Sequence, residues 1–288
     1  MLAQYIVSGL ASGAVYAVVA IGIVLIYRAS GVINFAHGEV AALGTFVVYS
    51  CWTAGVPIGF AIVIGMALSA VISPLIEAVA LGGLRNRTHL NEVMVTVALF
   101  LGINGLTLAL FGSETHNFPA LVTGSPIVLG NVVISRQTVL VLGFTIFLSI
   151  GLSVLFKTTR LGIAMRAVSE SRTSAVLAGL PVRWIIWGVW AAAGITGVAA
   201  GVLIAPIVYL NVNMMIEVLI KAFAGAVVGG LTSINGAIVG SLLLGIGESL
   251  LSGYVSSQLT TPFTFLVLVL ALVVRPQGLF GRNLEVKL

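Results

Sequence analysis

The chain has 288 residues, of which only 7% are charged while 59% are hydrophobic, and its mean hydropathy is +1.20. Roughly a quarter of a typical soluble domain is charged, and a soluble fold of this composition would expose large contiguous apolar patches. An ordinary soluble enzyme is therefore excluded. The net charge of +5 comes from scattered basic residues, which fits membrane topology better than nucleic-acid binding.

Long apolar runs predict the membrane spans. A hydrocarbon core of about 30 Å needs roughly 20 apolar residues per helix. The first run precedes the first basic residue, Arg28, which is typical of a transmembrane helix rather than of a cleavable signal peptide. About nine runs are found, and eight or ten spans are alternatives; the runs cover residues 3–27, 38–53, 58–82, 92–111, 138–156, 184–205, 214–231, 236–255 and 259–274.

The predicted fold class is therefore an all-α polytopic membrane protein, built as a single transmembrane domain over residues 1–288. Runs 38–53 and 214–231 are short and rich in glycine. For each of them, a half-helix or a re-entrant segment is an alternative to a full span, provided that protein rather than lipid surrounds it.

Lys and Arg concentrate in loops that nine spans would place on one side of the membrane. Short loops rich in these residues stay in the cytoplasm, whereas the loop 112–137 carries only Arg136. The N-terminus is thus predicted outside, the C-terminus in the cytoplasm and 112–137 as an external loop. The basic residues on the cytoplasmic side are Arg28, Arg85, Arg87, Lys157, Arg160, Arg166, Arg172, Arg183, Arg275, Arg282 and Lys287.

Small residues recur at the spacing that lets two helices approach closely. Lipid supplies no hydrophobic drive for helix association, so such pairs favour tight packing. We expect them to serve packing inside this chain rather than oligomerisation. The pairs are Gly9 with Gly13, Gly197 with Gly201, Gly225 with Gly229, and Gly236 with Gly240.

Motifs for catalysis, nucleotide binding or metal binding are not found. No G-x-x-x-x-G-K-[ST] loop occurs, so ATP is not bound by that route. His37, His89 and His116 are too far apart for a metal-binding motif. The sequence has no G-x-S-x-G elbow and no Asp for a conventional triad. A catalytic or metal site is not predicted, and function is expected to lie in passage or assembly.

The largest hydrophilic segment, 157–183, is too short for a domain but long enough for one or two interfacial helices. Its first part has an apolar stripe at Leu161, Ala164, Met165 and Val168, opposite Arg166, Glu170 and Thr173. A second stripe, Ala175, Val176 and Leu180, is interrupted at Gly179 and Pro181. The pattern alone leaves two alternatives: a helix lying on anionic lipid, or a docking helix for a cytoplasmic partner.

Four motifs, in order along almost the whole chain, resemble the LivH-type permeases of branched-chain amino acid ABC importers. The broader permease family also serves urea, amides and related solutes. The motifs are GVINFAHGEVAALG at 31–44, TRLGIAMRAVSESRTSAVLAGLPV at 159–182, KAFAGAVVGGLTSINGAIVGSLLLGIGES at 221–249 and VVRPQGLFG at 273–281.

The resemblance implies a non-catalytic subunit of the bacterial inner membrane that binds no cofactor itself. Its partners would be a second homologous permease, in a heterodimer rather than a homodimer, two cytoplasmic ATPases that use ATP and Mg²⁺, and an external binding protein. A short permease helix within 159–182 would dock into an ATPase groove. Coupling candidates there are the motif positions Arg160, Gly162, Arg166, Ala167 and Gly179, together with Glu170.

Ionisable residues inside membrane spans are costly and often mark a pathway. Glu217 and Lys221 stand at i and i+4 in the favourable order, which predicts a mutually neutralising pair rather than substrate contact. Glu248 has no such partner in its own span, so a cross-helix hydrogen bond, a protonated state and a pathway role are alternatives. Glu77, two turns before Arg85, is expected to make an interfacial contact.

Three polar residues, Asn34, His37 and Glu39, fall where the second run begins on the cytoplasmic side. They would line an inner gate or support the coupling helix. Alternatively, they satisfy the unpaired backbone groups of a broken helix end.

The predicted function is passage of a small polar solute through an ATP-driven importer, with a branched-chain or related amino acid as solute and urea or an amide as alternatives. A transporter driven by an ion gradient, with Glu217, Glu248 or Glu77 as proton carriers, is the alternative from another class.

Overall fold

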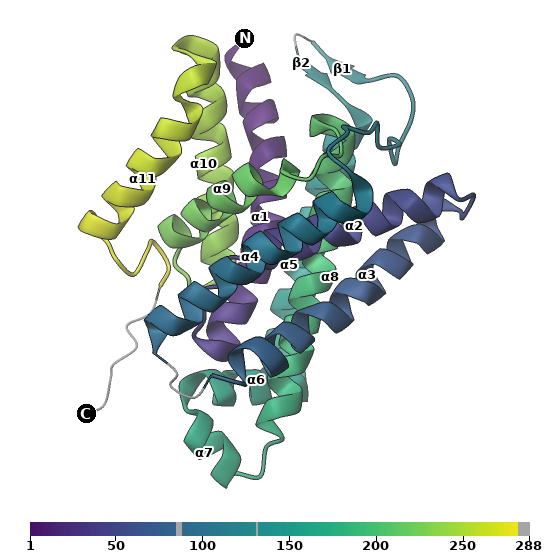
Figure 1. Cartoon of the computed structure of the whole chain (residues 1–288). Helices are drawn as coiled ribbons and strands as arrows, with labels where there is room; N and C mark the ends of the chain where they lie inside the picture. Colours follow the sequence, from purple (N-terminus) through teal and green to yellow (C-terminus); the bar gives the residue numbers. More distant parts are fainter. Residues whose placement is uncertain (85–87, 131, 282–288) are drawn as a thin grey trace. The chain divides into compact units, whose positions relative to one another are not determined.

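The structure is a computed structural model that describes residues 1–84, 88–130 and 132–281 (Figure 1). Arg85, Arg87, Arg282 and Lys287, which contributed to the predicted orientation, lie outside the described residues. The chain divides into two compact units. Unit 1 comprises Met1–Val24, Ala120–Ser149 and Ile220–Leu288, and unit 2 comprises Leu25–Pro119 and Ile150–Leu219.

Each of the nine apolar runs forms a helix among the described residues. Seven helical segments are long and apolar enough to cross a membrane, as expected of a polytopic membrane protein, and α2 and α9 are not among them. The helices are α1 (Leu2–Ser30), α2 (His37–Thr53), α3 (Ile58–Leu75), α4 (His89–Phe111), α5 (Arg136–Thr158), α8 (Val182–Val208), α9 (Met214–Gly229), α10 (Ile234–Tyr254) and α11 (Thr260–Val274).

Two helices are extended by turns of another geometry. Pro74 lies near the end of α3, and the chain continues as the π-helical segment η1 (Ile76–Leu81). Proline lacks the N–H that an α-helical turn requires, and isolated π-turns occur where the α-helical ladder is perturbed. A single 3₁₀ turn, η2 (Ser257–Leu259), precedes α11.

Unit 2 is organised around α2. Every residue of α2 from His37 to Phe46 is buried, and the helix packs against α3, α4 and α8. Trp190 of α8 and Val40 of α2 belong to the same apolar core. A short helix with a polar start can be held at membrane depth when protein surrounds it, and α2 meets that condition.

Glycines bring the helices of unit 1 together. A Cβ atom at Gly9 would lie 2.6 Å from the Cα of Ile246 on α10, and one at Gly13 would lie 2.8 Å from the Cα of Leu242. Gly225 and Gly229 of α9 likewise contact α10 at Ser241, Gly236 and Gly240, and in unit 2 the pair Gly197 and Gly201 contacts α2. The predicted use of these pairs for internal packing is confirmed.

The all-α prediction missed one short element in the loop 112–137. Strands β1 (Ile127–Leu129) and β2 (Val132–Ile134) form an antiparallel hairpin. The side chain of Gln4 contacts β2 through two hydrogen bonds: its Nε2 donates to the carbonyl of Val133 at 3.0 Å, and its Oε1 accepts from the Val133 N–H at 2.8 Å.

Candidate functional site

The segment 157–183 contains two short helices, α6 (Arg160–Glu170) and α7 (Arg172–Leu177), as predicted for an interfacial segment. Each is capped by the hydroxyl before it. Thr159 accepts a hydrogen bond from the N–H of Gly162 at 3.1 Å, and Ser171 accepts one from the N–H of Ser174 at 3.1 Å. The caps explain where both helices start.

The amphipathic pattern of α6 is confirmed. Met165 and Val168 are buried, whereas Arg166, Glu170 and Thr173 are exposed. The side chains of Lys157 and Leu161 lie outside the described set.

On α7 the predicted stripe is only partly right. Ala175 is buried, but Val176 is 60% exposed, and the neighbouring Leu177 is 84% exposed. Since α7 has fewer than two turns, it cannot turn all of its apolar residues inward. An uncovered apolar surface therefore lies on α7, which packs against α6.

Among the coupling candidates, two glycines determine the path of the backbone, and the charged residues have exposed side chains. A Cβ atom at Gly162 would lie 2.5 Å from the Cα of Phe156, and Gly179 adopts φ +75° just after α7. These glycines fix the backbone, because other residues would clash or be strained there. Ala167 is half-buried, and the side chains of Arg160, Arg166 and Glu170 are exposed.

Arg172 joins α7 to the end of α1, and sequence reasoning missed it. Its Nη2 donates to the carbonyl oxygens of Ser30 at 3.0 Å and Ala29 at 3.3 Å. The last carbonyls of a helix lack intrahelical partners, and a guanidinium satisfies them with favourable charge. The sequence marks Arg172 only as one basic residue among several in this segment.

Glu77 makes a buried contact with α8, and the interfacial contact expected for it stays a prediction. Its Oε2 accepts a hydrogen bond from Nε1 of Trp187 at 3.0 Å, and its side chain is buried. Arg85, which lies two turns further along the sequence, is outside the described residues.

Asn34 closes the turn that starts α2. Its Oδ1 accepts from the N–H of Ala36 at 3.0 Å, and its carbonyl accepts from the N–H of His37 at 3.3 Å. This is a local hydrogen-bonded turn typical of Asn. For Asn34, the contacts match the alternative in which it satisfies a broken helix end.

His37 and Glu39 are fully buried and only partly satisfied. Glu39 Oε2 accepts from Nδ2 of Asn104 at 3.0 Å, and the same Nδ2 lies 3.3 Å from Oδ1 of Asn213. Among the described residues, Glu39 Oε1 and His37 Nε2 have no hydrogen-bond partner. Most buried polar atoms have a partner, so such exceptions deserve a functional explanation. We define the α2 polar cluster as the two polar residues in the first turn of α2, His37 and Glu39, together with Asn104, which donates to Glu39, and Asn213, which accepts from Asn104.

Sequence reasoning missed Asn104 and Asn213. Asn104 is a single amide in the apolar run of α4, and Asn213 lies just before α9. A polar residue within a span is the one available signal, and it does not identify the partner.

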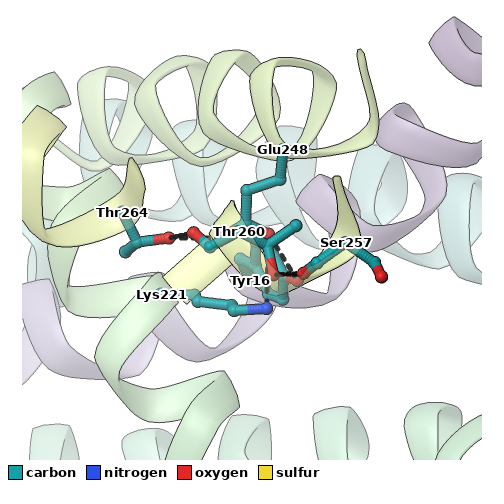
Figure 2. A network of polar contacts seen from close by, with 6 residues as sticks. All are labelled: Tyr16, Lys221, Glu248, Ser257, Thr260 and Thr264. Atoms are coloured by element: carbon teal, nitrogen blue, oxygen red, sulfur yellow. Dashed lines mark hydrogen bonds and ion pairs between the residues drawn. The ribbon is translucent and has the colours of Figure 1, made fainter. Parts of the chain in front are cut away.

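Unit 1 holds a second buried polar group, the Glu248 cluster of Tyr16, Lys221, Glu248 and Thr264 (Figure 2). Glu248 Oε2 lies 3.4 Å from Lys221 Nζ and accepts from the hydroxyl of Tyr16 at 3.0 Å. Thr264 donates to Glu248 Oε1. Lys221 Nζ also lies 5.7 Å from the centre of the Tyr16 ring, within cation–π range. The carboxylate of Glu248 on α10 thus contacts side chains of three other helices, α1, α9 and α11.

These contacts correct the prediction for α9. Among the described residues, the ion pair of Lys221 is formed with Glu248 and not with Glu217, so the intrahelical pair was wrong, and Glu217 is exposed. The cross-helix hydrogen bond expected for Glu248 is confirmed. The pathway roles considered for Glu217, Lys221 and Glu248 stay predictions.

A mostly helical chain with seven candidate spans, polar clusters buried among its helices and an amphipathic segment between two spans defines a polytopic membrane transport protein. Residues 5–274 match the profile of the family described as branched-chain amino acid transport system / permease component, and the chain belongs to that family. It is accordingly a permease component, as the four sequence motifs indicated.

The curated relatives are similar over nearly their full length. The chain is 30% identical to the high-affinity branched-chain amino acid transport system permease protein LivH of Escherichia coli K12, over 97% of this chain and 95% of that protein. It is 31% identical to the corresponding protein BraD of Pseudomonas aeruginosa, with the same coverage. Among solved structures, PsaBC from Streptococcus pneumoniae in complex with Fab matches 95% of this chain and 92% of that chain at 14% identity, with a TM-score of 0.49.

Proposed function

We propose that this chain is the permease subunit of an ATP-driven importer for branched-chain amino acids in a bacterial cytoplasmic membrane. The observation that carries the proposal is the family match over residues 5–274, together with relatives whose names specify high-affinity branched-chain amino acid transport. Urea and amides are the competing solutes within the broader family.

In the proposed topology, all nine helices predicted from the apolar runs cross or enter the membrane, with the N-terminus outside and the C-terminus in the cytoplasm. The short helices α2 and α9 would be held at membrane depth by protein. The burial of α2 from His37 to Phe46 supports this arrangement.

The proposed partner of α6 and α7 is a cytoplasmic ATPase, which would bind and hydrolyse ATP with Mg²⁺ while this chain binds neither. The exposed apolar side chains of Val176 and Leu177, next to the exposed charges of Arg166 and Glu170, support docking to a protein. A lipid-lying helix would turn its apolar face toward the membrane, whereas the apolar face of α6 is packed against its own unit.

Further proposed partners are a second, homologous permease in a heterodimer and an external binding protein that selects the solute. With selection made outside, the permease needs few polar contacts along the pathway. We propose that the α2 polar cluster lines the inner gate, because two buried polar atoms of the first turn of α2, His37 Nε2 and Glu39 Oε1, have no hydrogen-bond partner among the described residues.

The alternative of a secondary transporter rests on carboxylates within the spans, with Glu217, Glu248 or Glu77 as proton carriers. Glu248 has an ion pair and two hydroxyl donors, so its contacts are those of a packing residue that links helices. The importer is therefore the better supported function.

Reconstitution in vesicles tests the proposal. Vesicles that contain this chain, its partner permease and the two ATPases are expected to take up leucine under one condition. ATP must be present on the side of the membrane that carries the ATPases, and the binding protein on the opposite side. Uptake by this chain alone under an ion gradient would contradict an importer. Uptake of urea in preference to leucine, valine and isoleucine by the full assembly would contradict the proposed solute.

A further inference from the structure

A cavity of about 620 Å³ lies in unit 2, beside the first turns of α8. Its charged lining residues come from three elements: Glu77 of η1, Arg172 of α7 and Arg183 of α8. Apolar lining comes from Val176, Val182 and Ile186. The cavity has the size of a small-molecule site, and its lining combines both signs of charge with an apolar wall.

The cationic side is anchored by aromatic contacts. The guanidinium carbon of Arg183 lies 4.5 Å from the centre of the Trp187 ring, and Trp187 contacts Trp184 edge to face. Trp184 lines the cavity and is 70% exposed. Because α8 starts at Val182 and is long and apolar enough to cross a membrane, these residues lie at the end of a candidate span. Exposed Trp and Arg at a span end are typical of the membrane–water interface.

The chemistry of the lining selects a phosphate group carried by a lipid. Arginine is the preferred partner of phosphate oxygens, and basic pockets between helices on the cytoplasmic side bind lipid head groups. The apolar wall formed by Val182 and Ile186 fits the glycerol backbone and the start of an acyl chain. Free phosphate would leave that wall exposed to water.

The carboxylate of Glu77 limits which lipid head groups the cavity can bind. It would repel a purely anionic group but attract an ammonium. Its Oε2 accepts from Trp187, whose ring also contacts Arg183, so the acidic and basic sides of the cavity are held together by one indole. We propose that this cavity binds the head group of an ethanolamine phospholipid, with the phosphate at Arg172 and Arg183 and the ammonium at Glu77.

This inference does not depend on the transported solute or on the ATPase, and the purified full-length chain can test it. The chain in detergent is offered phosphatidylethanolamine and phosphatidylcholine with identical acyl chains, and retained lipid is measured by native mass spectrometry. The two lipids carry the same charges, but only the ethanolamine ammonium has N–H groups for Glu77. Phosphatidylethanolamine is expected to be retained about tenfold more strongly, the ratio expected for one charge-assisted hydrogen bond.

Three variants separate the contacts. Arg183→Gln is expected to lower retention of both lipids by about tenfold, Glu77→Gln to remove the preference for ethanolamine, and Arg166→Gln, an exposed arginine outside the cavity, to change neither. Arg183 is exposed, so its variant tests the site even if Glu77→Gln fails to fold.

Three results would overturn the proposal: equal retention of both lipids by the unaltered chain, displacement of the lipid by excess inorganic phosphate, or loss of the lipid when the ATPase subunits are added. The second would assign the cavity to a free anion, and the third would assign it to the ATPase.

Discussion

The two buried carboxylates, Glu248 in unit 1 and Glu39 in unit 2, have opposite surroundings. Glu248 has a lysine counter-charge and two hydroxyl donors, so both of its oxygens have partners. Glu39 has one amide donor, and one of its oxygens has no hydrogen-bond partner among the described residues. A buried charge is tolerated when it is paired and hydrogen-bonded, and it is costly otherwise.

We propose that Glu248 has a structural role and Glu39 a functional one. The contacts of Glu248 tie four helices of unit 1 to one point, as a packing contact should. The α2 polar cluster keeps unsatisfied atoms at the start of a buried helix, and such a cost is expected to persist where function requires it. Substitutions in the Glu248 cluster should therefore change mainly the free energy of unfolding, and loss of the Glu39 carboxyl group should change mainly uptake.

The largest expected change in stability comes from Lys221→Met. It leaves the buried carboxylate of Glu248 without its counter-charge and is expected to lower the free energy of unfolding by about 3–5 kcal/mol. The measurement is unfolding of the purified chain by denaturing detergent in mixed micelles. The double variant Lys221→Met/Glu248→Gln removes both charges and should recover most of the loss, because the two effects are coupled. Additive losses would show that the pair is not a unit.

The contrast also shows what the sequence could predict. The sequence could predict the membrane spans, the two helices of segment 157–183 and the packing through glycines. All three follow from periodicity and spacing, which are local properties of the chain. The Glu248 cluster does not, because Tyr16 and Glu248 are 232 positions apart and their meeting depends on the tertiary fold. The ion pair of Lys221 was predicted with Glu217 for the same reason, because the i, i+4 rule considers only residues of the same helix.

For the α2 polar cluster, the sequence identified half of the residues. His37 and Glu39 stood out within a recognisable motif, whereas Asn104 and Asn213 are single amides in separate segments. The contact of Asn104 with Glu39 arises from packing of α4 against α2, and Asn213 contacts Asn104 rather than Glu39. The β-hairpin was missed because each of its strands has only three residues.

Asn104→Leu is expected to have the next largest effect. It removes the donor to Glu39 Oε2 and leaves a buried carboxylate without a partner, at a cost of about 1.5–3 kcal/mol of unfolding free energy. Asn213→Ala is the matched control, since Asn213 is exposed and contacts the amide of Asn104 rather than the carboxylate. If both variants lose the same stability, the hydrogen bond to Glu39 does not carry the effect.

Tyr16→Phe should cost less, about 1 kcal/mol, because it removes one hydroxyl donor while Lys221 and Thr264 still contact Glu248. The ring remains for the cation–π contact with Lys221. Tyr254→Phe, whose side chain is exposed, is the control and should leave unfolding unchanged. Uptake by the reconstituted importer should stay within about twofold for both variants, since a change of that size in stability leaves the chain folded. A strong loss of uptake in Tyr16→Phe without a loss of stability would contradict a purely structural role and would indicate that the Glu248 cluster lies in the transport pathway.

Glu39→Gln has the smallest expected effect on stability and the clearest effect on transport. Glutamine keeps the size of the side chain and an acceptor for Asn104 while removing the buried charge, so the free energy of unfolding should change by less than about 1 kcal/mol. We expect ATP-driven uptake by the reconstituted importer to fall at least tenfold while ATP hydrolysis continues, because the proposed gate then lacks the ionisable carboxyl group at the start of α2. Glu114→Gln, in an exposed loop, is the control for loss of an acidic residue. Unchanged uptake in Glu39→Gln would remove any essential ionised role for Glu39. The two buried carboxylates would then differ in their contacts without differing in function.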